Sequence, residues 1–451
     1  MKTEAILGTL ASDSVASFSL LAYMLLLLGI SPFFTNWFPL GDFSLNAAEW
    51  YHAVMIPFAL FLMIVSASVM RLSRKLRLAL DASAYMVIFV TILGLAFMSG
   101  PVGTVSEGVR DAWVFLLALA FDLALVLYPL RHRDRFKSIY GAYSLLLLAS
   151  LSATLAGVYG LILAQGMFVG FSSVPQLQSY VTSLGINDTT FEANLVTSHS
   201  HEMLPAVMGG IVALTALSVG YEGLESRRRN LVNAGMLLSC LGIVTMSYLY
   251  FVSGLGTYSI PTLFPSGPGG MNGLALDDSQ TGIVGWGALV SLVGLWSFLK
   301  KSSLRLASVM TWVFAMLSLI GVGYYIEFNE SYYGFGSPGV PPAGGPGYLH
   351  DDAFMSGHLM FPFFMLPLMA GVLLYLDRYV PDGWKRSVSL VSLVGMVVGL
   401  VGLVEFVVTT NWYVEGVGLI IMGLAGALGT AAASRDALSN AAKGPDAELR
   451  G

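Results

Sequence analysis

Three histidines in this chain are each followed by a methionine-containing turn and then a proline. They open the segments His52–Pro57, His201–Pro205 and His358–Pro362. The segments recur at intervals of about 150 residues, which indicates an internal repeat. Imidazole is a ligand that suits both haem iron and copper, and a proline that bends a helix makes room for a flat macrocycle. We therefore predict that these histidines bind a metal, or else that they are hydrogen-bonded residues of a transporter.

The other histidines are weaker candidates. His199 lies two residues before His201, so on a helix the two side chains point about 200° apart. We expect them to serve two sites, or one to bind metal while the other donates to a propionate or a carboxylate. His350 is expected at a loop or helix start, with a surface metal or proton site as the alternative. His132 lies among arginines and is expected to be a solvated loop residue.

Acidic residues within apolar segments are candidates for proton transfer. Asp122 and Glu405 have no basic neighbour in the sequence, so they are expected either to pass protons or to hydrogen-bond to a facing helix. Glu202 adjoins His201 and could raise the basicity of the imidazole or anchor a haem edge. Adjacent helical residues diverge by about 100°, which disfavours direct pairing of these two. Asp81 lies one turn after a basic residue and is expected to pair with it.

Composition identifies the surroundings of these residues. The chain has 451 residues, of which 56% are hydrophobic and only 11% charged, and its mean hydropathy is +0.74. A soluble domain carries more than twice this share of charge. The net charge of −5 argues against a nucleic-acid partner. The single cysteine, Cys240, excludes a disulfide framework, a thiolate cluster and covalent haem attachment.

Twelve apolar runs are long enough to cross a bilayer. They cover residues 14–36, 48–70, 77–99, 111–130, 139–165, 196–220, 231–253, 282–299, 304–327, 352–376, 385–410 and 412–433. We therefore predict an all-α integral membrane bundle of twelve transmembrane helices. The apolar run nearest the N-terminus is too long for a signal peptide and is expected to be retained as a span.

The three histidine segments fall early in spans two, six and ten. This predicts three pseudo-symmetric four-helix arcs in a single membrane domain over residues 1–451. The repeats are expected at about residues 14–137, 138–301 and 302–434. Of the 22 Lys and Arg residues, all but Arg110 fall on one side of the twelve spans, and we expect Arg110 in a loop of the other side. Both termini, with a tail over residues 435–451, are therefore predicted to be cytoplasmic.

The spans, the termini and the histidine positions resemble subunit I of the haem–copper oxidase superfamily. The stretch Glu49–Pro57, Glu-Trp-Tyr-His-Ala-Val-Met-Ile-Pro, resembles the family's span-two His-Gly-x-x-Met stretch. The resemblance implies that His52 and His358 clamp a low-spin haem, and that His199 or His201 matches a copper-binding histidine of span six. A second, local resemblance links the stretch His-Ser-His-Glu-Met that begins at His199 to the NnrS family of haem- and copper-containing membrane proteins.

Three departures separate the chain from the oxidase pattern. Span ten reads Ser-Gly-His358 where the family has His-x-His, so a high-spin haem ligand is missing. Span six has no tyrosine four residues after its histidine, since Met203 and Pro205 stand near that point. Residues Tyr248–Thr257 contain no histidine pair. A copper site with three imidazoles cannot be assembled from spans six and seven, and oxygen reduction of the usual kind is not expected.

These features predict a b-type cytochrome subunit in the cell membrane of a prokaryote. It is expected to hold one or two haems b, with copper possible but not favoured, and to pass electrons between quinol and an outer-facing redox protein of a respiratory complex. The first alternative is a terminal oxidase or nitric oxide reductase subunit with a rearranged site built from His199, His201 and His350. The second is a haem-free transporter.

Overall fold

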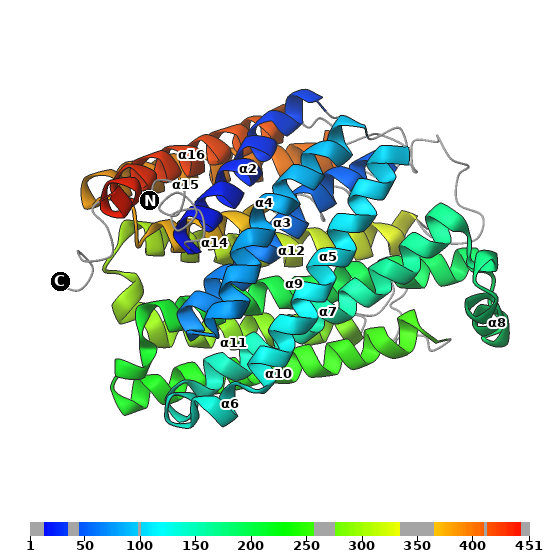
Figure 1. The fold of residues 1–451 in the computed structure, drawn as a ribbon, viewed down its shortest axis with the longest axis horizontal. Helices are drawn as coiled ribbons and strands as arrows, with labels where there is room; N and C mark the ends of the chain where they lie inside the picture. Colours follow the sequence, from blue (N-terminus) through cyan, green and yellow to red (C-terminus); the bar gives the residue numbers. More distant parts are fainter. Residues whose placement is uncertain are drawn as a thin grey trace. The chain divides into compact units, whose positions relative to one another are not determined.

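The computed structural model describes residues 13–34, 45–97, 101–256, 276–333, 365–409 and 413–442. Every regular element in these ranges is a helix (Figure 1). Eight of the described helices are long and apolar enough to cross a membrane, and they coincide with the second, third, fifth to eighth, eleventh and twelfth predicted spans. The prediction of an all-α membrane protein is confirmed at this level. The chain divides into two compact units.

Unit one comprises Met1–Leu117 and Ser297–Gly451. Its helices are α2 (Asp13–Phe34), α3 (Leu45–Met70), α4 (Arg74–Ala96), the first part of α5 (Pro101–Val126), α12 (Ser303–Tyr333), α14 (Leu366–Leu376), α15 (Asp382–Thr409) and α16 (Tyr413–Ala442). Helix α16 packs along α15 and α2, while α2, α3 and α4 contact one another and α12 contacts α14 and α15. Segments from opposite ends of the sequence therefore share one core.

Glycines allow α15 and α16 to approach closely. A Cβ atom at Gly402 of α15 would lie 2.0 Å from the backbone nitrogen of Glu415, and one at Gly418 of α16 would lie 2.3 Å from the backbone nitrogen of Gly399. Only residues without a side chain fit at such contacts. Small residues at helix crossings are the usual means of packing in membranes, where lipid removes the hydrophobic drive between helices.

Unit two comprises Ala118–Trp296. Its elements are the end of α5, α6 (Tyr128–Arg131), α7 (Arg133–Val169), η1 (Phe171–Ser173), α8 (Pro175–Ser183), α9 (Asp188–Val219), η2 (Tyr221–Gly223), α10 (Ser226–Gly254) and most of α11 (Leu276–Leu299). Helices α7, α9 and α10 pack against one another. A buried apolar cluster that includes Tyr159, Phe171, Val181 and Phe191 seats η1 and α8 on α7 and α9. The predicted repeat over residues 138–301 falls largely within this unit.

Local sequence explains several helix ends. The side chain of Asn187 accepts a hydrogen bond from the backbone N–H of Thr190 at 2.8 Å, which caps the start of α9. The same helix ends at Gly220, whose φ of +66° is a left-handed conformation that favours glycine. Ser73 likewise caps α4 by accepting from the N–H of Leu76.

The fourth predicted span needs correction. It was expected over residues 111–130 with Arg110 in a loop, but α5 begins at Pro101 and Arg110 is only 1% exposed. Proline suits the first turn of a helix. Glu107, Arg110 and Val114 are all buried at helical spacing, so Arg110 faces the helix bundle, with its Nε 2.7 Å from a carboxylate oxygen of Asp111. The charged residues before position 112 therefore lie inside the helix and do not mark its start.

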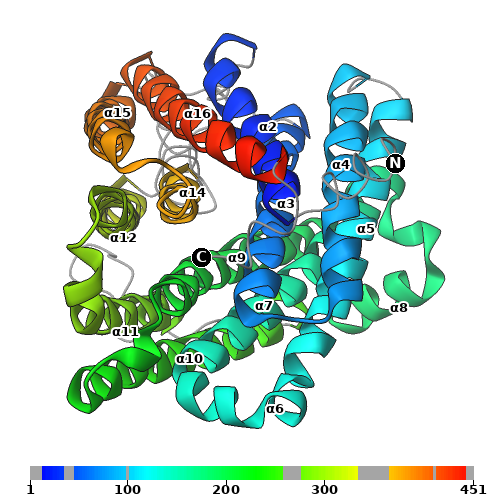
Figure 2. The same cartoon turned by 60° about the vertical axis from the view of Figure 1, so that its left-hand side comes forward.

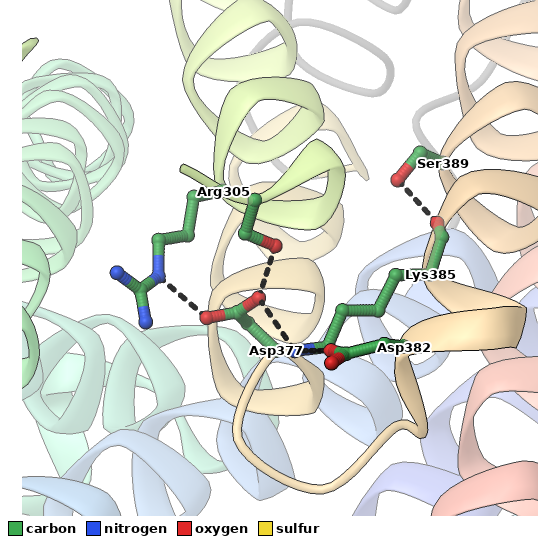
Figure 3. Close-up of polar contacts among 6 residues, drawn as sticks. Arg305, Asp377, Asp382, Lys385 and Ser389 are labelled. Atoms are coloured by element: carbon green, nitrogen blue, oxygen red, sulfur yellow. Dashed lines mark hydrogen bonds and ion pairs between the residues drawn. The ribbon is translucent and has the colours of Figure 1, made fainter. Parts of the chain in front are cut away.

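A charged network joins three helices of unit one (Figure 3). Asp377 follows α14, and its side chain is only 2% exposed. Its oxygens accept a hydrogen bond from Ser302 and lie 2.5 Å from Nε of Arg305, beside the start of α12. Nζ of Lys385, in the first turn of α15, lies 3.6 Å from Asp377 and 2.9 Å from Asp382. The network fixes the ends of α12, α14 and α15 against one another.

Candidate functional site

Helix α9 positions two of the predicted ligands, and both imidazoles are held in the same way. Nδ1 of His199 lies 2.7 Å from the carbonyl oxygen of Ala156 on α7. Nδ1 of His201 lies 2.9 Å from the carbonyl oxygen of Thr197, one turn earlier on α9. Because a carbonyl oxygen only accepts hydrogen bonds, Nδ1 carries the hydrogen in both rings. In the neutral ring Nε2 then carries the lone pair, and this is the tautomer in which a histidine binds a metal through Nε2.

The two rings lie against different helices. His199 packs against α7, where a Cβ atom at Gly160 would come within 2.9 Å of its Cε1. His201 stacks on Tyr250 of α10, with ring centroids 5.4 Å apart and an interplanar angle of 28°. Both side chains are half-buried. The two rings therefore lie on different flanks of α9, and whether one or both bind a metal stays a prediction.

Glu202 lies at a polar junction of three helices. Its side chain is fully buried, and its Oε1 accepts hydrogen bonds from Ser152 of α7 at 2.9 Å and from Ser247 of α10. Oε2 has no hydrogen-bond partner. The carboxylate thus points toward α7 and α10 and does not pair with the adjacent His201. We call Ser152, Glu202 and Ser247 the three-helix polar junction.

Two further polar groups lie near this junction. The hydroxyl of Tyr159 on α7 is buried without a hydrogen-bond partner. Ser198 of α9 is buried and donates to the carbonyl oxygen of Tyr250 at 3.2 Å. Buried polar groups in an apolar bundle are costly unless they are satisfied. Tyr159 precedes Gly160, which lies against His199, and Ser198 precedes His199 in α9, so both polar groups lie beside the histidine-bearing part of α9.

Asp122 is held by the facing helix. It is 5% exposed, and its two oxygens accept hydrogen bonds from Ser150 and, at 2.7 Å, from Thr154, both on α7. Of the two roles expected for this residue, the geometry shows the bond to a facing helix. Glu405 is half-buried near the end of α15, in unit one, and so belongs to neither this contact nor the three-helix polar junction.

The remaining predicted residues do not belong to α9. His52 is half-buried in α3, five residues before Pro57, which lies inside the same helix. His358 and His350 fall outside the described residues, so the predicted pairing of His52 with His358 stays a prediction. His132 is exposed between α6 and α7, as expected for a solvated loop residue.

The donor set suits some metal groups better than others. Among the described residues, no three His, Cys, Asp or Glu side chains gather closely enough to hold a metal ion. A copper site with three protein ligands would therefore need a donor from outside those residues. A haem iron needs only one imidazole on each face. An imidazole fixed through Nδ1, as in His199 and His201, fits that requirement.

Sequence reasoning missed the serines and the tyrosine that surround Glu202. Ser152, Tyr159 and Ser247 stand in long apolar helices. Many polar residues in such helices simply bond to their own helix, as Ser66 does to the carbonyl oxygen of Leu62. Nothing in the sequence distinguishes the two cases. Only the packing of α7, α9 and α10 shows which hydroxyls reach across.

Comparison with known proteins provides no further assignment. The chain matches no family model, no curated protein and no solved structure. The function is therefore argued from the motifs and from the geometry of the site.

Proposed function

We propose that this chain is an integral membrane b-type cytochrome subunit of a respiratory electron-transfer complex. It would pass electrons between quinol and an outer-facing redox protein of the same complex. The observation that carries the proposal is the fixed tautomer of two imidazoles inside an apolar helix bundle. Nδ1 of His199 and Nδ1 of His201 each donate a hydrogen bond to a backbone carbonyl oxygen, so Nε2 is the nitrogen that would bind a metal. The repeated segment at His52, within α3, supports the same role in unit one.

The proposed cofactor is haem b, which supplies one-electron transfer when bound. His52 and His358 would be the axial pair of the first haem. His201, with His199 as its substitute, would hold a second haem or a copper ion. Copper is not favoured, because it needs a third donor such as His350. Tyr250, which stacks on His201, would keep that ring in one orientation.

Proton transfer is proposed for Glu202, Asp122 and Glu405. Glu202 is the strongest of the three, because its Oε2 has no partner in the structure and can accept a proton without breaking a hydrogen bond. Both oxygens of Asp122 are already bound by hydroxyls. A proton on Asp122 would therefore add to an oxygen that already accepts a hydroxyl hydrogen bond.

The proposed topology has twelve spans in three four-helix arcs, with both termini and the tail over residues 435–451 on the cytoplasmic side of a prokaryotic cell membrane. Eight long apolar helices support a multi-pass arrangement. The side is argued from the distribution of basic residues, which resist translocation. The buried position of Arg110 removes the one basic residue that was expected in an outer loop.

The test is a pyridine haemochrome assay on the purified protein and on single variants. His52→Ala and His358→Ala should each abolish the reduced-minus-oxidised haem b band. His132→Ala is the matched control and should leave the band intact, because that residue is exposed and does not belong to any of the three histidine–proline segments. Retention of the band in both single variants would reject the axial pair.

The same preparation tests the other functions. A correctly folded, colourless protein would favour a transporter without haem. Consumption of oxygen or nitric oxide by the purified protein would favour a terminal oxidase or nitric oxide reductase. Metal analysis that finds one haem and no copper per chain would remove the second metal position.

A further inference from the structure

A groove of about 720 Å³ runs between α2 and α16 in unit one. Figure 1 and Figure 2 show the two helices side by side and antiparallel, with the start of α2 near the end of α16. The groove is lined from Val15 to Leu26 on α2 and from Ile420 to Ser434 on α16. At 1.5 Å per residue this is about 16 to 21 Å of helix. The space is therefore long and narrow, and its volume is that of a small-molecule site.

The lining of the groove is polar at one end only. Hydroxyl groups come from Ser19, Thr430 and Ser434, which lie toward the start of α2 and the end of α16. The other end is lined by Leu25, Leu26 and further apolar or small residues. No charged side chain is among the lining residues that the structure describes. The groove thus matches an amphipathic molecule with a long apolar chain and an uncharged polar head.

The hydroxyls also define the hydrogen-bonding character of that head. Ser19 donates to the carbonyl oxygen of Val15 at 2.9 Å, and Thr430 donates to that of Gly426 at 2.8 Å. Ser434 donates in the same way to Ala431 at 3.1 Å. A hydroxyl that donates to its own helix still presents oxygen lone pairs. The complementary head group is therefore a hydrogen-bond donor.

We propose that the groove between α2 and α16 binds an isoprenoid quinol, with its hydroxyl groups at Ser19 and Thr430 and its chain along the apolar end. A hydroquinone is uncharged, donates through its two hydroxyls and carries a long prenyl chain. A phospholipid of the membrane also has long chains, but its phosphate would find no cation among the described lining residues. The proposal rests on the proposed function, since a cytochrome subunit in a membrane needs a lipid-soluble electron donor.

Leu26 and Leu424 are 61% and 56% exposed at the groove, so a chain can enter from the lipid.

The groove can be tested by filling it. Ala22→Phe and Ala427→Phe place an aromatic ring on the lining, and each should weaken binding of decyl-ubiquinol or decyl-menaquinol at least tenfold in equilibrium dialysis with the detergent-solubilised full chain. Val401→Phe is the matched control. This residue of α15 is 59% exposed and is not part of the lining, so the same added bulk should leave quinol binding unchanged.

The hydroxyls can be tested by their dependence on redox state. Ser19→Ala combined with Thr430→Val should weaken binding of the quinol about tenfold, the value for two neutral hydrogen bonds. Binding of the corresponding quinone should change little, because quinone oxygens only accept. Equal weakening of both redox forms would overturn the assignment of the head group.

A haem assay on each preparation separates this inference from the proposed function. Loss of quinol binding in the groove variants with the haem b band retained supports the site. If the wild-type protein holds haem but binds neither of the two quinols, the proposed quinol site is wrong. The site is also wrong if native mass spectrometry shows that Ala22→Phe displaces only phospholipid. If the protein binds quinol but holds no haem, the quinol site in the groove is supported and the proposed cytochrome function is rejected.

Discussion

Asp377→Asn offers a sharp test of how unit one is held together. The substitution preserves the shape of the side chain but removes the charge that Arg305 and Lys385 share (Figure 3). These two basic side chains are 27% and 20% exposed. Without the carboxylate Arg305 would lose its charged partner, whereas Lys385 would keep Asp382 at 2.9 Å. Asparagine can still accept a hydrogen bond from Ser302 through its amide oxygen. The loss is therefore mainly electrostatic.

The magnitude follows from the degree of burial. Removing one partner of a fully buried ion pair costs about 3–5 kcal/mol, whereas exposed pairs are worth about 0–1 kcal/mol. The basic groups here can still turn toward solvent, which places Asp377→Asn at about 2–3 kcal/mol of lost unfolding free energy. Arg305, at 2.5 Å, should account for more of this loss than Lys385, at 3.6 Å.

A double-mutant cycle measures the pair directly. Unfolding free energies would be taken from SDS titrations of the wild type, Asp377→Asn, Arg305→Met and the double variant, and we expect a coupling of about 1–2 kcal/mol. Asp382→Asn is the control, because that carboxylate is 95% exposed and its loss should not be measurable. Additive effects of Asp377→Asn and Arg305→Met would refute the reasoning, since residues that interact cannot contribute independently.

Two other perturbations test the helix junctions. Glu202→Ala removes the carboxylate that accepts from Ser152 and Ser247 and leaves a cavity, so unit two should lose about 3 kcal/mol. The rate at which the single, buried Cys240 reacts with a thiol reagent reports this loss, and an unchanged rate would contradict the junction. Gly402→Ala should cost about 2–3 kcal/mol, because the added Cβ would lie 2.0 Å from the backbone of α16. Gly383 lies on the same helix, and a Cβ atom added there would have no other atom within 4 Å. Gly383→Ala should therefore be neutral or stabilising in the same titration. Equal effects of the two alanine substitutions would exclude close packing as the cause.

Much of the helical framework was predictable because a helix in a bilayer is a local structure. All its backbone hydrogen bonds form within one segment, so an apolar run such as residues 231–253 predicts the helix Ser226–Gly254 from its own composition. The helix ends were less predictable, because polar residues in the first turns of a helix interrupt the apolar run that predicts it. This is why α5 begins at Pro101 and not at residue 111.

The sequence predicts which histidines are candidate metal ligands, but it does not predict which residues contact them. The repeated histidine and proline segments and the two histidines on one helix are visible in the sequence, and so is the angle that separates His199 from His201. The carbonyl oxygen that holds Nδ1 of His199 belongs to Ala156, on another helix. No sequence pattern connects these two residues, because the register between α7 and α9 sets the contact.

The sequence by itself determined that this protein is helical, rich in membrane-length apolar segments and equipped with recurring imidazoles, because each of these properties resides in a short stretch of chain. The tertiary structure alone decided that Glu202 receives hydroxyls from two other helices, that Arg110 faces inward, and that α2 meets α16 along a groove. These are contacts between residues far apart in the chain. They depend on how helices pack, and packing is set by side-chain shape over the whole bundle rather than by any local pattern.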